Sequence, residues 1–320
     1  MGYKTMDANE AVSRVSYKFT EIAGIYPITP ASPMAEKVDV LASKGEINFW
    51  GNKVKVIEME SEKGAIATVH GALQAGVLAT TYTASQGLLL MIPSIYKMAG
   101  EMLPGVIHVA ARSLSTHSLS IFGDHQDIYA VRQTGACMLS SSSVEEAYHM
   151  AMVSHLASIK SSLPFINFFD GFRTSHEIDK VKEIDLSKLE TLIDKKALRK
   201  FRDNGMISGA TTRGTAENED VYFQHTESRN GYYTKAIDNV IYYMDKINKI
   251  CKTDYKPFNY YGDKSSDTVI IAMGSVCECI KEVVDDLNKK GKKVGLVTVH
   301  LYRPFSNSYL SSIIPSSVKK

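Results

Sequence analysis

Short apolar runs rich in β-branched and aromatic residues recur along the first half of the chain. They occupy residues 24–28, 54–58, 77–83, 105–111, 136–139 and 163–169. Most of them are separated by segments in which apolar residues repeat with the spacing of an α-helix. Strands that alternate with helices in this way predict a parallel sheet with helices on both faces, so residues 1–170 are expected to form an open α/β domain.

Polar residues mark the expected starts of two of these helices. The segment 7–24 begins with Asp7, and Glu10 follows at the position of a capping-box partner. A second helix is expected to start in the same way at Ser143. In the first helix the apolar residues would share one face until Gly24 ends it, and these residues are Val12, Val15, Phe19 and Ile22.

After residue 170 the pattern changes to charged helical segments, which are joined by a polar stretch at 204–220. We predict that residues 171–260 are a helical excursion of the first domain, which then spans residues 1–260. A polar linker follows, and after it a β-α-β unit whose helix is expected to end at Gly291. One such unit is too small to bury a core of its own, so residues 261–320 are expected to be an incomplete second α/β domain.

The composition is that of an ordinary soluble globular protein. Of the residues, 44% are hydrophobic and 22% are charged, and a net charge of +2 gives no reason to expect nucleic acid as a partner. No apolar segment approaches the roughly 18 residues of a membrane span, and the first residues lack the apolar core of a signal peptide. Scattered cysteines predict reduced thiols. The sequence therefore predicts a cytosolic protein without a membrane contact.

Polar side chains gather where the predicted strands end. Ligands bind beyond the carboxyl ends of the strands in an open parallel sheet. A hydroxyl, a carboxylate and an arginine at one edge suit an anionic carbonyl compound beside a cofactor, whereas no Gly-rich dinucleotide or Walker loop is present. The residues at these ends are Thr29, Glu58, Glu60, Glu62, Thr83, Ser85, Gln86, Arg112, Ser113, Ser115, Ser140, Asp170 and Arg173.

Seven blocks of sequence follow one another in a characteristic order. They read IYPITPASPMAE (25–36), MESEKGAIATVHGALQAG (59–76), TYTASQGLLLMIPSIYKMAGEMLPGVIHVAAR (81–112), SIFGDHQDIYAVRQTG (120–135), FFDGFRTSHEI (168–178), RGTAENEDVYFQ (213–224) and VTVHLYRPF (297–305). In this order they resemble the N-terminal region of pyruvate:ferredoxin (flavodoxin) oxidoreductases, which belong to the 2-oxoacid:ferredoxin oxidoreductase family. The resemblance covers essentially the whole chain.

The resemblance implies a fold and a reaction. The first domain would be the pyrimidine-side half of a thiamine diphosphate site, and the second would be an incomplete domain like the C-terminal domain of transketolase. The implied reaction is the oxidative decarboxylation of pyruvate with coenzyme A to acetyl-CoA and carbon dioxide. Electrons would pass through iron–sulfur clusters to ferredoxin or flavodoxin.

The resemblance also implies roles for Glu62, Thr29 and Arg112. Glu62 matches the family glutamate that hydrogen-bonds the pyrimidine ring nitrogen of thiamine diphosphate. Thr29 and Arg112 match the residues that hold pyruvate. Arginine suits this task because its planar fork can donate two charge-assisted hydrogen bonds to one carboxylate.

Each assignment has a simpler alternative. Glu62 can be a first-turn residue that complements the helix dipole. Thr29 can be an ordinary strand-end residue before Pro30, and Arg112 can be a salt-bridge partner of Asp124 or Asp127.

One position departs from the family pattern. Lys63 follows Glu62, where the family usually carries an alanine. If the ammonium group faced the carboxylate, it would favour the ionised carboxylate and weaken proton sharing with the cofactor. Because adjacent helical residues do not face each other, we expect Lys63 to point elsewhere.

Other parts of the implied enzyme are missing from this sequence. It has no Gly-Asp-Gly stretch of the kind that anchors the diphosphate through magnesium, no cysteine run for an iron–sulfur cluster, and no set of metal ligands. Two hypotheses follow. The chain is either the N-terminal portion of a working enzyme, or a non-catalytic partial chain or assembly module that needs further domains.

The expected partners follow from the same resemblance. They are pyruvate, coenzyme A, ferredoxin or flavodoxin, and missing C-terminal domains or partner subunits, in a full enzyme that is a homodimer. The compartment would be the cytosol or an organelle of anaerobic metabolism. The 2-oxoacid, the electron acceptor and the physiological direction stay open.

Overall fold

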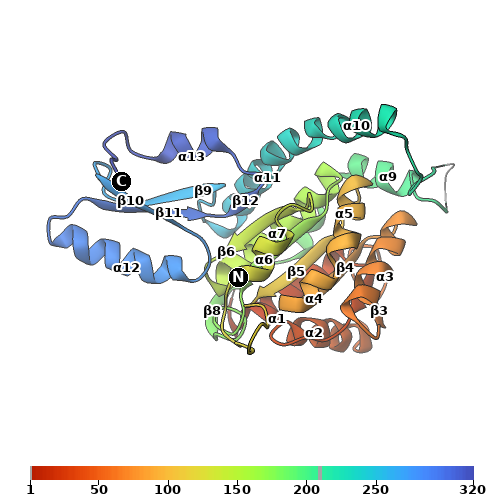
Figure 1. The fold of residues 1–320 in the computed structure, drawn as a ribbon. Helices are drawn as coiled ribbons and strands as arrows, with labels where there is room; N and C mark the ends of the chain where they lie inside the picture. Colours follow the sequence, from red (N-terminus) through yellow and green to blue (C-terminus); the bar gives the residue numbers. More distant parts are fainter. Residues whose placement is uncertain (1, 208–210) are drawn as a thin grey trace.

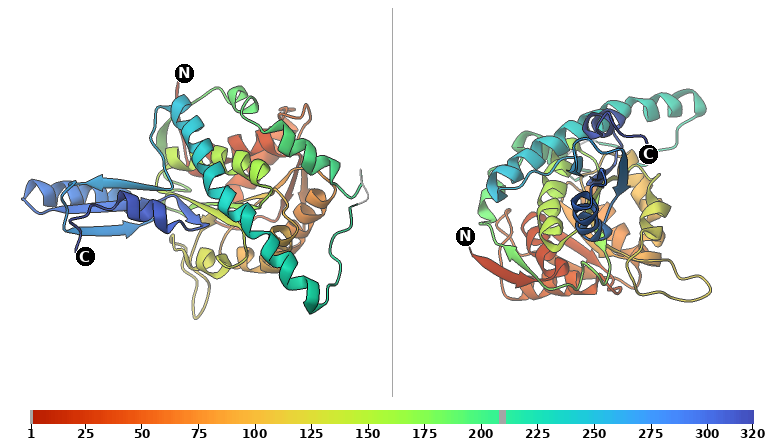
Figure 2. Two further views of the ribbon diagram at one scale, coloured as in Figure 1. Left: turned by 90° about the horizontal axis from the view of Figure 1, so that it is seen from above. Right: turned by 90° about the vertical axis from the view of Figure 1, so that its left-hand side faces the viewer.

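The computed structural model describes residues 2–207 and 211–320. Residues 208–210 of the predicted polar stretch lie outside the described residues. Within the described ranges the strands form a seven-stranded sheet, a three-stranded sheet and a two-stranded sheet. We call the first the large sheet and the second the small sheet. The small sheet projects beyond the large one (Figures 1 and 2).

The large sheet has the strand order β12-β6-β7-β5-β4-β2-β3. Every neighbouring pair is parallel except β12 and β6. The predicted parallel sheet of an α/β domain is thus confirmed. The strands are β2 (Ile22–Ile25), β3 (Lys55–Glu58), β4 (Ala79–Thr83), β5 (Val106–Ala111), β6 (Cys137–Ser141), β7 (Phe165–Asp170) and β12 (Leu301–Arg303).

Helices cover both faces of the large sheet because the chain reverses its direction of winding at the edge strand β3. One face carries α1 (Ala8–Phe19), α2 (Ser32–Ser43) and α7 (Val144–Ser161). The other face carries α3 (Glu62–Gln74), α4 (Ser85–Leu90), α5 (Ile92–Gly100) and α6 (Gln126–Val131).

The remaining elements surround this domain. The short strands β1 (Tyr3–Met6) and β8 (Asp179–Lys182) pair with each other. After β8 come α8 (Ser187–Glu190), α9 (Lys195–Asp203), α10 (Glu219–Ser228) and α11 (Asn230–Cys251), and both α9 and α11 pack against α7. The small sheet contains β9 (Phe258–Gly262), β10 (Thr268–Ala272) and β11 (Val294–Val299), with α12 (Val276–Lys289) and α13 (Asn307–Ile313).

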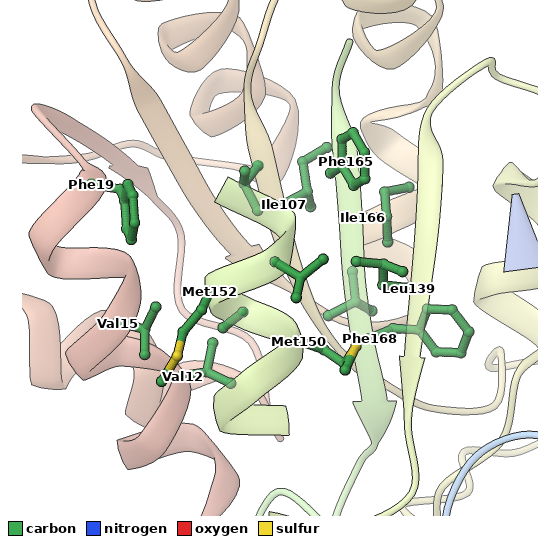
Figure 3. Close-up of a cluster of buried hydrophobic side chains, with 14 of the residues drawn as sticks. Val12, Val15, Phe19, Ile107, Leu139, Met150, Met152, Phe165, Ile166 and Phe168 are labelled. Atoms are coloured by element: carbon green, nitrogen blue, oxygen red, sulfur yellow. The ribbon is translucent and has the colours of Figure 1, made fainter. Parts of the chain in front are cut away.

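The main hydrophobic core lies between the large sheet and helices α1 and α7. Figure 3 shows Val12 and Val15 of α1 beside Met152 of α7, with Ile107 and Phe165 of the sheet nearby. Helix α7 is buried on nearly every side, because α1 and α11 pack against it while it covers the sheet. This explains why its apolar residues are spread around the helix instead of forming one stripe.

The predicted helix starts are confirmed. The side chain of Asp7 accepts the backbone N–H of Glu10 at 2.7 Å, and the side chain of Ser143 accepts the N–H of Glu146 at 3.2 Å. Each cap satisfies one of the N–H groups that a helix leaves free in its first turn.

The predicted end of the first helix was wrong. The helix ends at Phe19, and Ile22 belongs to strand β2, which covers Ile22–Ile25 instead of the predicted 24–28. Gly24 does not stop a helix. It allows β2 to approach α3, because a Cβ at Gly24 would lie 2.5 Å from the carbonyl oxygen of Ala65.

The predicted β-α-β unit is confirmed, since β10 and β11 are parallel and α12 connects them. Its last strand, however, is divided. β11 ends at Val299, and Leu301–Arg303 forms β12, which pairs with β6 of the large sheet. The backbone of His300 bridges the two sheets, with its N–H donated to Pro257 and its carbonyl accepting from Ser140. The predicted boundary between residues 260 and 261 falls inside β9.

Two buried histidines form a polar pair in the core of the large sheet. The Nε2 atoms of His108 and His155 lie 3.1 Å apart, and Nδ1 of His108 lies 3.1 Å from the amide nitrogen of Asn167. Burial lowers the pKa of His108 to about 3. Burial, and then the neighbouring His108, hold the pKa of His155 well below its ordinary value. Both rings are therefore neutral in the folded protein at neutral pH.

We expect this pair to make folding sensitive to acid. A histidine whose pKa is lower in the folded state stabilises fully above about pH 6.5 and loses that contribution as the pH falls below it. Between about pH 7.5 and 5.5 the difference in unfolding free energy between wild type and His155→Gln should narrow by about 1.4 kcal/mol. Urea unfolding at each pH measures this difference in free energy, and His117→Gln, at an exposed histidine, is the control. A difference between wild type and His155→Gln that stays constant with pH would contradict the neutral, buried state of the pair.

Candidate functional site

The first turn of α3 presents Glu62 at the carboxyl edge of the large sheet. The side chain of Ser61 caps this helix by accepting the backbone N–H of Gly64 at 3.2 Å. Glu62 is the first helical residue and is only 7% exposed. The close approach of β2 at Gly24 to the Ala65 carbonyl holds this end of α3 against the sheet. Small residues thus allow a carboxylate to be buried at the start of the helix.

The side chain of Glu62 lies against Gly87. A Cβ on Gly87 would be 2.8 Å from Cγ and Oε1 of Glu62 and 2.6 Å from Oγ1 of Thr83. Within the described residues the Glu62 carboxylate has no hydrogen bond or ion pair with protein. The buried hydroxyl of Thr83 has no hydrogen-bond partner there either. Lys63 is exposed, and within the described residues no ion pair joins it to Glu62. The result is a buried carboxylate that is available to a ligand.

Asp127 joins the ends of two neighbouring strands. Its Oδ2 accepts the backbone N–H of Ser85 at 2.8 Å, just after β4, and that of Arg112 at 3.0 Å, just after β5. Its Oδ1 accepts the N–H of Ile128 at 2.8 Å. Burial raises the pKa of Asp127 to about 6, although these N–H groups act in the opposite direction. Ser85, with a φ of 50°, is held in a left-handed conformation at this junction.

The guanidinium of Arg112 is buried without an acidic partner. Arg112 is 7% exposed, and its Nε has no hydrogen-bond partner among the residues of the described ranges. The same ranges contain no ion pair between Arg112 and Asp124 or Asp127, so the salt-bridge alternative is not found. Burial lowers the pKa of Arg112, and the charge of Asp127 opposes this shift. A buried cation with an unused donor suits an anionic ligand.

Thr29 lies in the turn after β2, which packs on the end of β7. The carbonyl oxygen of Pro30 accepts a hydrogen bond from the side chain of Asn9 at 3.0 Å. A Cβ at Gly171 would lie 2.6 Å from Cγ of Pro30 and 2.8 Å from the carbonyl oxygen of Ala111. Gly171 therefore lets the turn of Thr29 approach the strand end that precedes Arg112. The side chain of Thr29 is exposed.

A third cluster links the large sheet to the small one. Asp170, at the end of β7, accepts from Nε2 of His125 at 2.6 Å through Oδ1. Its Oδ2 accepts from the backbone N–H of Ser275 at 2.9 Å and from the Ser275 hydroxyl at 2.5 Å. Burial acts to lower the pKa of His125, but the bond to Asp170 and nearby carboxylates raise it overall. Burial acts to raise the pKa of Asp170, but His125 and then Ser275 lower it overall.

The structure places all three predicted site residues at the carboxyl edge of the large sheet. Arg112 and Thr29 flank the turn at Gly171, and Glu62 reaches the same edge beside β4. Asp127 was considered only as a salt-bridge partner of Arg112, and its role at the strand ends was missed. Gly87 was also missed. Asp127 and Gly87 lie in two of the blocks that resemble the family, residues 120–135 and 81–112, and this resemblance was the signal that could have indicated them.

The described residues contain a pocket of about 460 Å³ beside the loop that follows Arg112. It does not include Glu62, Thr29 or Arg112, and it is lined by Leu114, Thr116, Asp124, His125, Gln126, Tyr129, Ala130 and Arg132. In the same described ranges, no group of three or more His, Cys, Asp or Glu residues is arranged to hold a metal ion. None of the helices there is long and apolar enough to cross a membrane.

Comparison with known proteins gives matches along nearly the whole chain. The family model for "Pyruvate flavodoxin/ferredoxin oxidoreductase, thiamine diP-bdg" matches residues 14–245. The model for "Pyruvate:ferredoxin oxidoreductase core domain II" matches residues 266–319. A pyruvate-flavodoxin oxidoreductase of Enterobacter agglomerans is 56% identical over 98% of the chain. A pyruvate:ferredoxin oxidoreductase of Moorella thermoacetica is 50% identical over 100% of it. The chain spans only 27% of the length of each relative.

A solved structure shares the fold. It is a 2-oxoglutarate:ferredoxin oxidoreductase from Magnetococcus marinus with 2-oxoglutarate, coenzyme A and succinyl-CoA bound. The TM-score is 0.75 at 20% sequence identity, and the match covers 100% of this chain and 57% of that one. At this identity the likeness shows the fold alone.

The close contact at Gly87 gives a test of the site geometry. Gly87→Ala should displace Glu62 or Thr83 and lower the free energy of unfolding by about 1 to 3 kcal/mol, because the new methyl group has no space. The matched control is Gly71→Ala in α3, where a Cβ would meet nothing within 4 Å. This control should be neutral or more stable by about 0.5 to 1 kcal/mol. Equal stability of both variants in thermal or urea unfolding would refute the described packing.

Proposed function

The chain belongs to the pyruvate flavodoxin/ferredoxin oxidoreductase family, and on this premise we propose that it supplies half of a thiamine diphosphate site and the clamp for pyruvate. The proposed reaction is the oxidative decarboxylation of pyruvate, with coenzyme A as acyl acceptor, to acetyl-CoA and carbon dioxide. The two electrons released pass to ferredoxin or flavodoxin. The observation that carries the proposal is that Glu62 is only 7% exposed, and its carboxylate forms no hydrogen bond or ion pair with protein in the described ranges.

Glu62 is suited to hold the pyrimidine ring of the cofactor. A buried carboxylate without a hydrogen bond is costly, so a donor from a ligand stabilises it. Glycine at position 87 allows the Glu62 carboxylate to lie here, because a Cβ would be 2.8 Å from its Oε1. When bound, thiamine diphosphate supplies a carbon nucleophile that attacks a 2-oxo acid and accepts the electron pair released on decarboxylation. The task of Glu62 is to hydrogen-bond the ring nitrogen and share a proton with it.

Arg112 and Thr29 are suited to orient the substrate. The buried guanidinium can donate to the pyruvate carboxylate, and the Thr29 hydroxyl can donate a further hydrogen bond from the turn across Gly171. Asp127 fixes the backbone of Arg112, so the guanidinium starts from a defined position. Burial of Arg112 strengthens its attraction for an anion because water does not compete. These residues orient pyruvate beside the group that Glu62 holds.

Further parts of the enzyme would come from other domains or subunits. We propose that the magnesium ion, the diphosphate anchor and the iron–sulfur clusters are held outside this chain, since it spans 27% of its relatives' length. For the same reason we propose that the isolated chain is inactive and acts as a structural part of a larger enzyme. We further propose that the full enzyme is a homodimer. Its proposed compartment is the cytosol, or an organelle of anaerobic metabolism.

The role of Glu62 can be tested in the assembled enzyme that carries this chain. Glu62→Gln keeps the size of the side chain but cannot share a proton in the same way, so pyruvate-dependent reduction of a viologen dye should fall by about 100-fold or more. The matched control is Glu60→Gln, because Glu60 is exposed two residues earlier. Its rate should equal that of wild type. A Glu62→Gln enzyme with a near-normal rate would eliminate this assignment.

The substrate clamp can be tested with Arg112. Arg112→Lys retains the charge but loses the planar fork, so KM for pyruvate should rise by about tenfold or more. Arg112→Ala should also lower kcat/KM by about 100-fold or more. Arg199→Ala is the control, because the Arg199 side chain is 85% exposed. Steady-state kinetics with pyruvate and with 2-oxoglutarate would distinguish weaker binding of pyruvate from a change of preferred substrate. An unchanged KM for pyruvate in both Arg112 variants would reject the role of Arg112 in holding the substrate.

A further inference from the structure

Asp170 uses both carboxylate oxygens to hold two parts of the molecule that are far apart in the sequence. One oxygen binds His125 in the loop after β5, and the other binds Ser275 at the start of α12. The side chain is 13% exposed, so water competes little with these bonds. A single aspartate at the end of β7 thus connects the large sheet to the helix of the small sheet.

The α12 side of this contact is tightly packed. The backbone N–H of Ser275 is at the N-terminus of a helix of 14 residues, where a negative charge is favourable. Gly274 precedes it with a φ of 81°. A Cβ at Gly274 would lie 2.7 Å from Oδ1 of Asp170 and 2.8 Å from Cε1 of His125. Only glycine allows α12 to approach both side chains.

The other side of the contact leads to Arg112. His125 is two residues before Asp127, which accepts the backbone N–H of Arg112. Arg112 also forms a backbone bridge with Gly123, where the same loop returns to the sheet. A Cβ at Gly123 would lie 3.0 Å from Cβ of Asp170, so the returning loop lies directly on Asp170. The position of Asp170 therefore constrains both ends of the loop that follows Arg112.

The arrangement excludes a hydrolytic role for Ser275. In a serine hydrolase the imidazole lies between the serine and the carboxylate, so that it can remove the serine proton. Here the carboxylate lies between, with the Ser275 hydroxyl and Nε2 of His125 on its two oxygens. Among the described residues the Ser275 hydroxyl has a hydrogen bond to no base other than this carboxylate, which accepts its proton. The cluster instead holds the loop after Arg112 and the start of α12 in place.

We propose that Asp170 is a positioning residue that couples the docking of the small sheet to the placement of Arg112. When α12 is seated, Ser275 and Gly274 fix Asp170 and His125, and these fix the loop that carries Arg112 and Asp127. The consequence for pyruvate rests on the proposed function of Arg112, whereas the mechanical coupling does not. The coupling should affect substrate affinity more than the rate of the chemical step.

The experiment perturbs the contact from each side in the assembled enzyme. Asp170→Asn removes the negative charge that binds both His125 and Ser275. Gly274→Ala places a methyl group against the side chains of Asp170 and His125 from the α12 side. Asp194→Asn is the control for the first, because Asp194 also caps a helix and binds a cation, Lys160, but at α9. Gly291→Ala is the control for the second, since Gly291 has a φ of 79° at the other end of α12 and a Cβ there would meet nothing within 4 Å.

Two readouts are compared for all four variants. Hydrogen–deuterium exchange is measured in peptides covering residues 112–127, and KM and kcat are measured for pyruvate. We expect Asp170→Asn and Gly274→Ala each to accelerate exchange in 112–127 by about fivefold or more and to raise KM by a similar factor, with kcat within about threefold of wild type. The two controls should match wild type in both readouts.

The coupling is overturned if Gly274→Ala accelerates exchange only in the first turn of α12 and leaves residues 112–127 at the control value. It is equally overturned if Asp170→Asn behaves like Asp194→Asn. If wild type does not turn over pyruvate, the proposed function fails, and the exchange readout still decides the coupling. If Asp170→Asn does not fold, exchange in residues 112–127 of Gly274→Ala, compared with Gly291→Ala, still tests the coupling.

Discussion

The carboxyl edge of the large sheet depends on the hydrogen bonds of the buried Asp127 carboxylate. It accepts backbone N–H groups from Ser85, Arg112 and Ile128, so one side chain sets the ends of β4 and β5 and the start of α6. Strand ends in an open sheet otherwise leave such groups without partners, which is costly when they are buried. With the backbone fixed in this way, the start of the Arg112 side chain is held at the strand end, and among residues 2–207 and 211–320 no acidic side chain pairs with its guanidinium.

Close approaches at glycines bring the other elements to this edge. Gly24 allows α3 to pack closely against β2, and Gly87 allows Glu62 to lie beside Thr83. Gly171 allows the turn of Thr29 to lie beside Ala111. A side chain at any of these positions would separate elements that now touch. These contacts are tight: a Cβ at Gly24 would meet the Ala65 carbonyl oxygen, and a Cβ at Gly87 would meet the side chains of Glu62 and Thr83. Close packing of this kind limits the movement of the groups at the edge, and a binding site benefits from that stiffness.

The two sheets are connected by more than the linker between them. Strand β12 leaves the small sheet to pair with β6, and Asp170 of the large sheet binds the start of α12. The path of the chain therefore brings the second unit against the edge where the candidate site lies. These two contacts give the small-sheet unit a direct connection to the candidate site.

The sequence by itself determined the parallel α/β sheet, the helix starts at Asp7 and Ser143, and the edge at which Glu62, Thr29 and Arg112 lie, because periodicity and capping act between residues close in the chain. Ile22 was misassigned because one apolar residue fits a helix or a strand equally well. The tertiary structure alone decided that Leu301–Arg303 joins the large sheet, that Asp127 holds strand ends and that Asp170 meets Ser275. These contacts join residues distant in the chain, and only the packing of the whole fold brings them together.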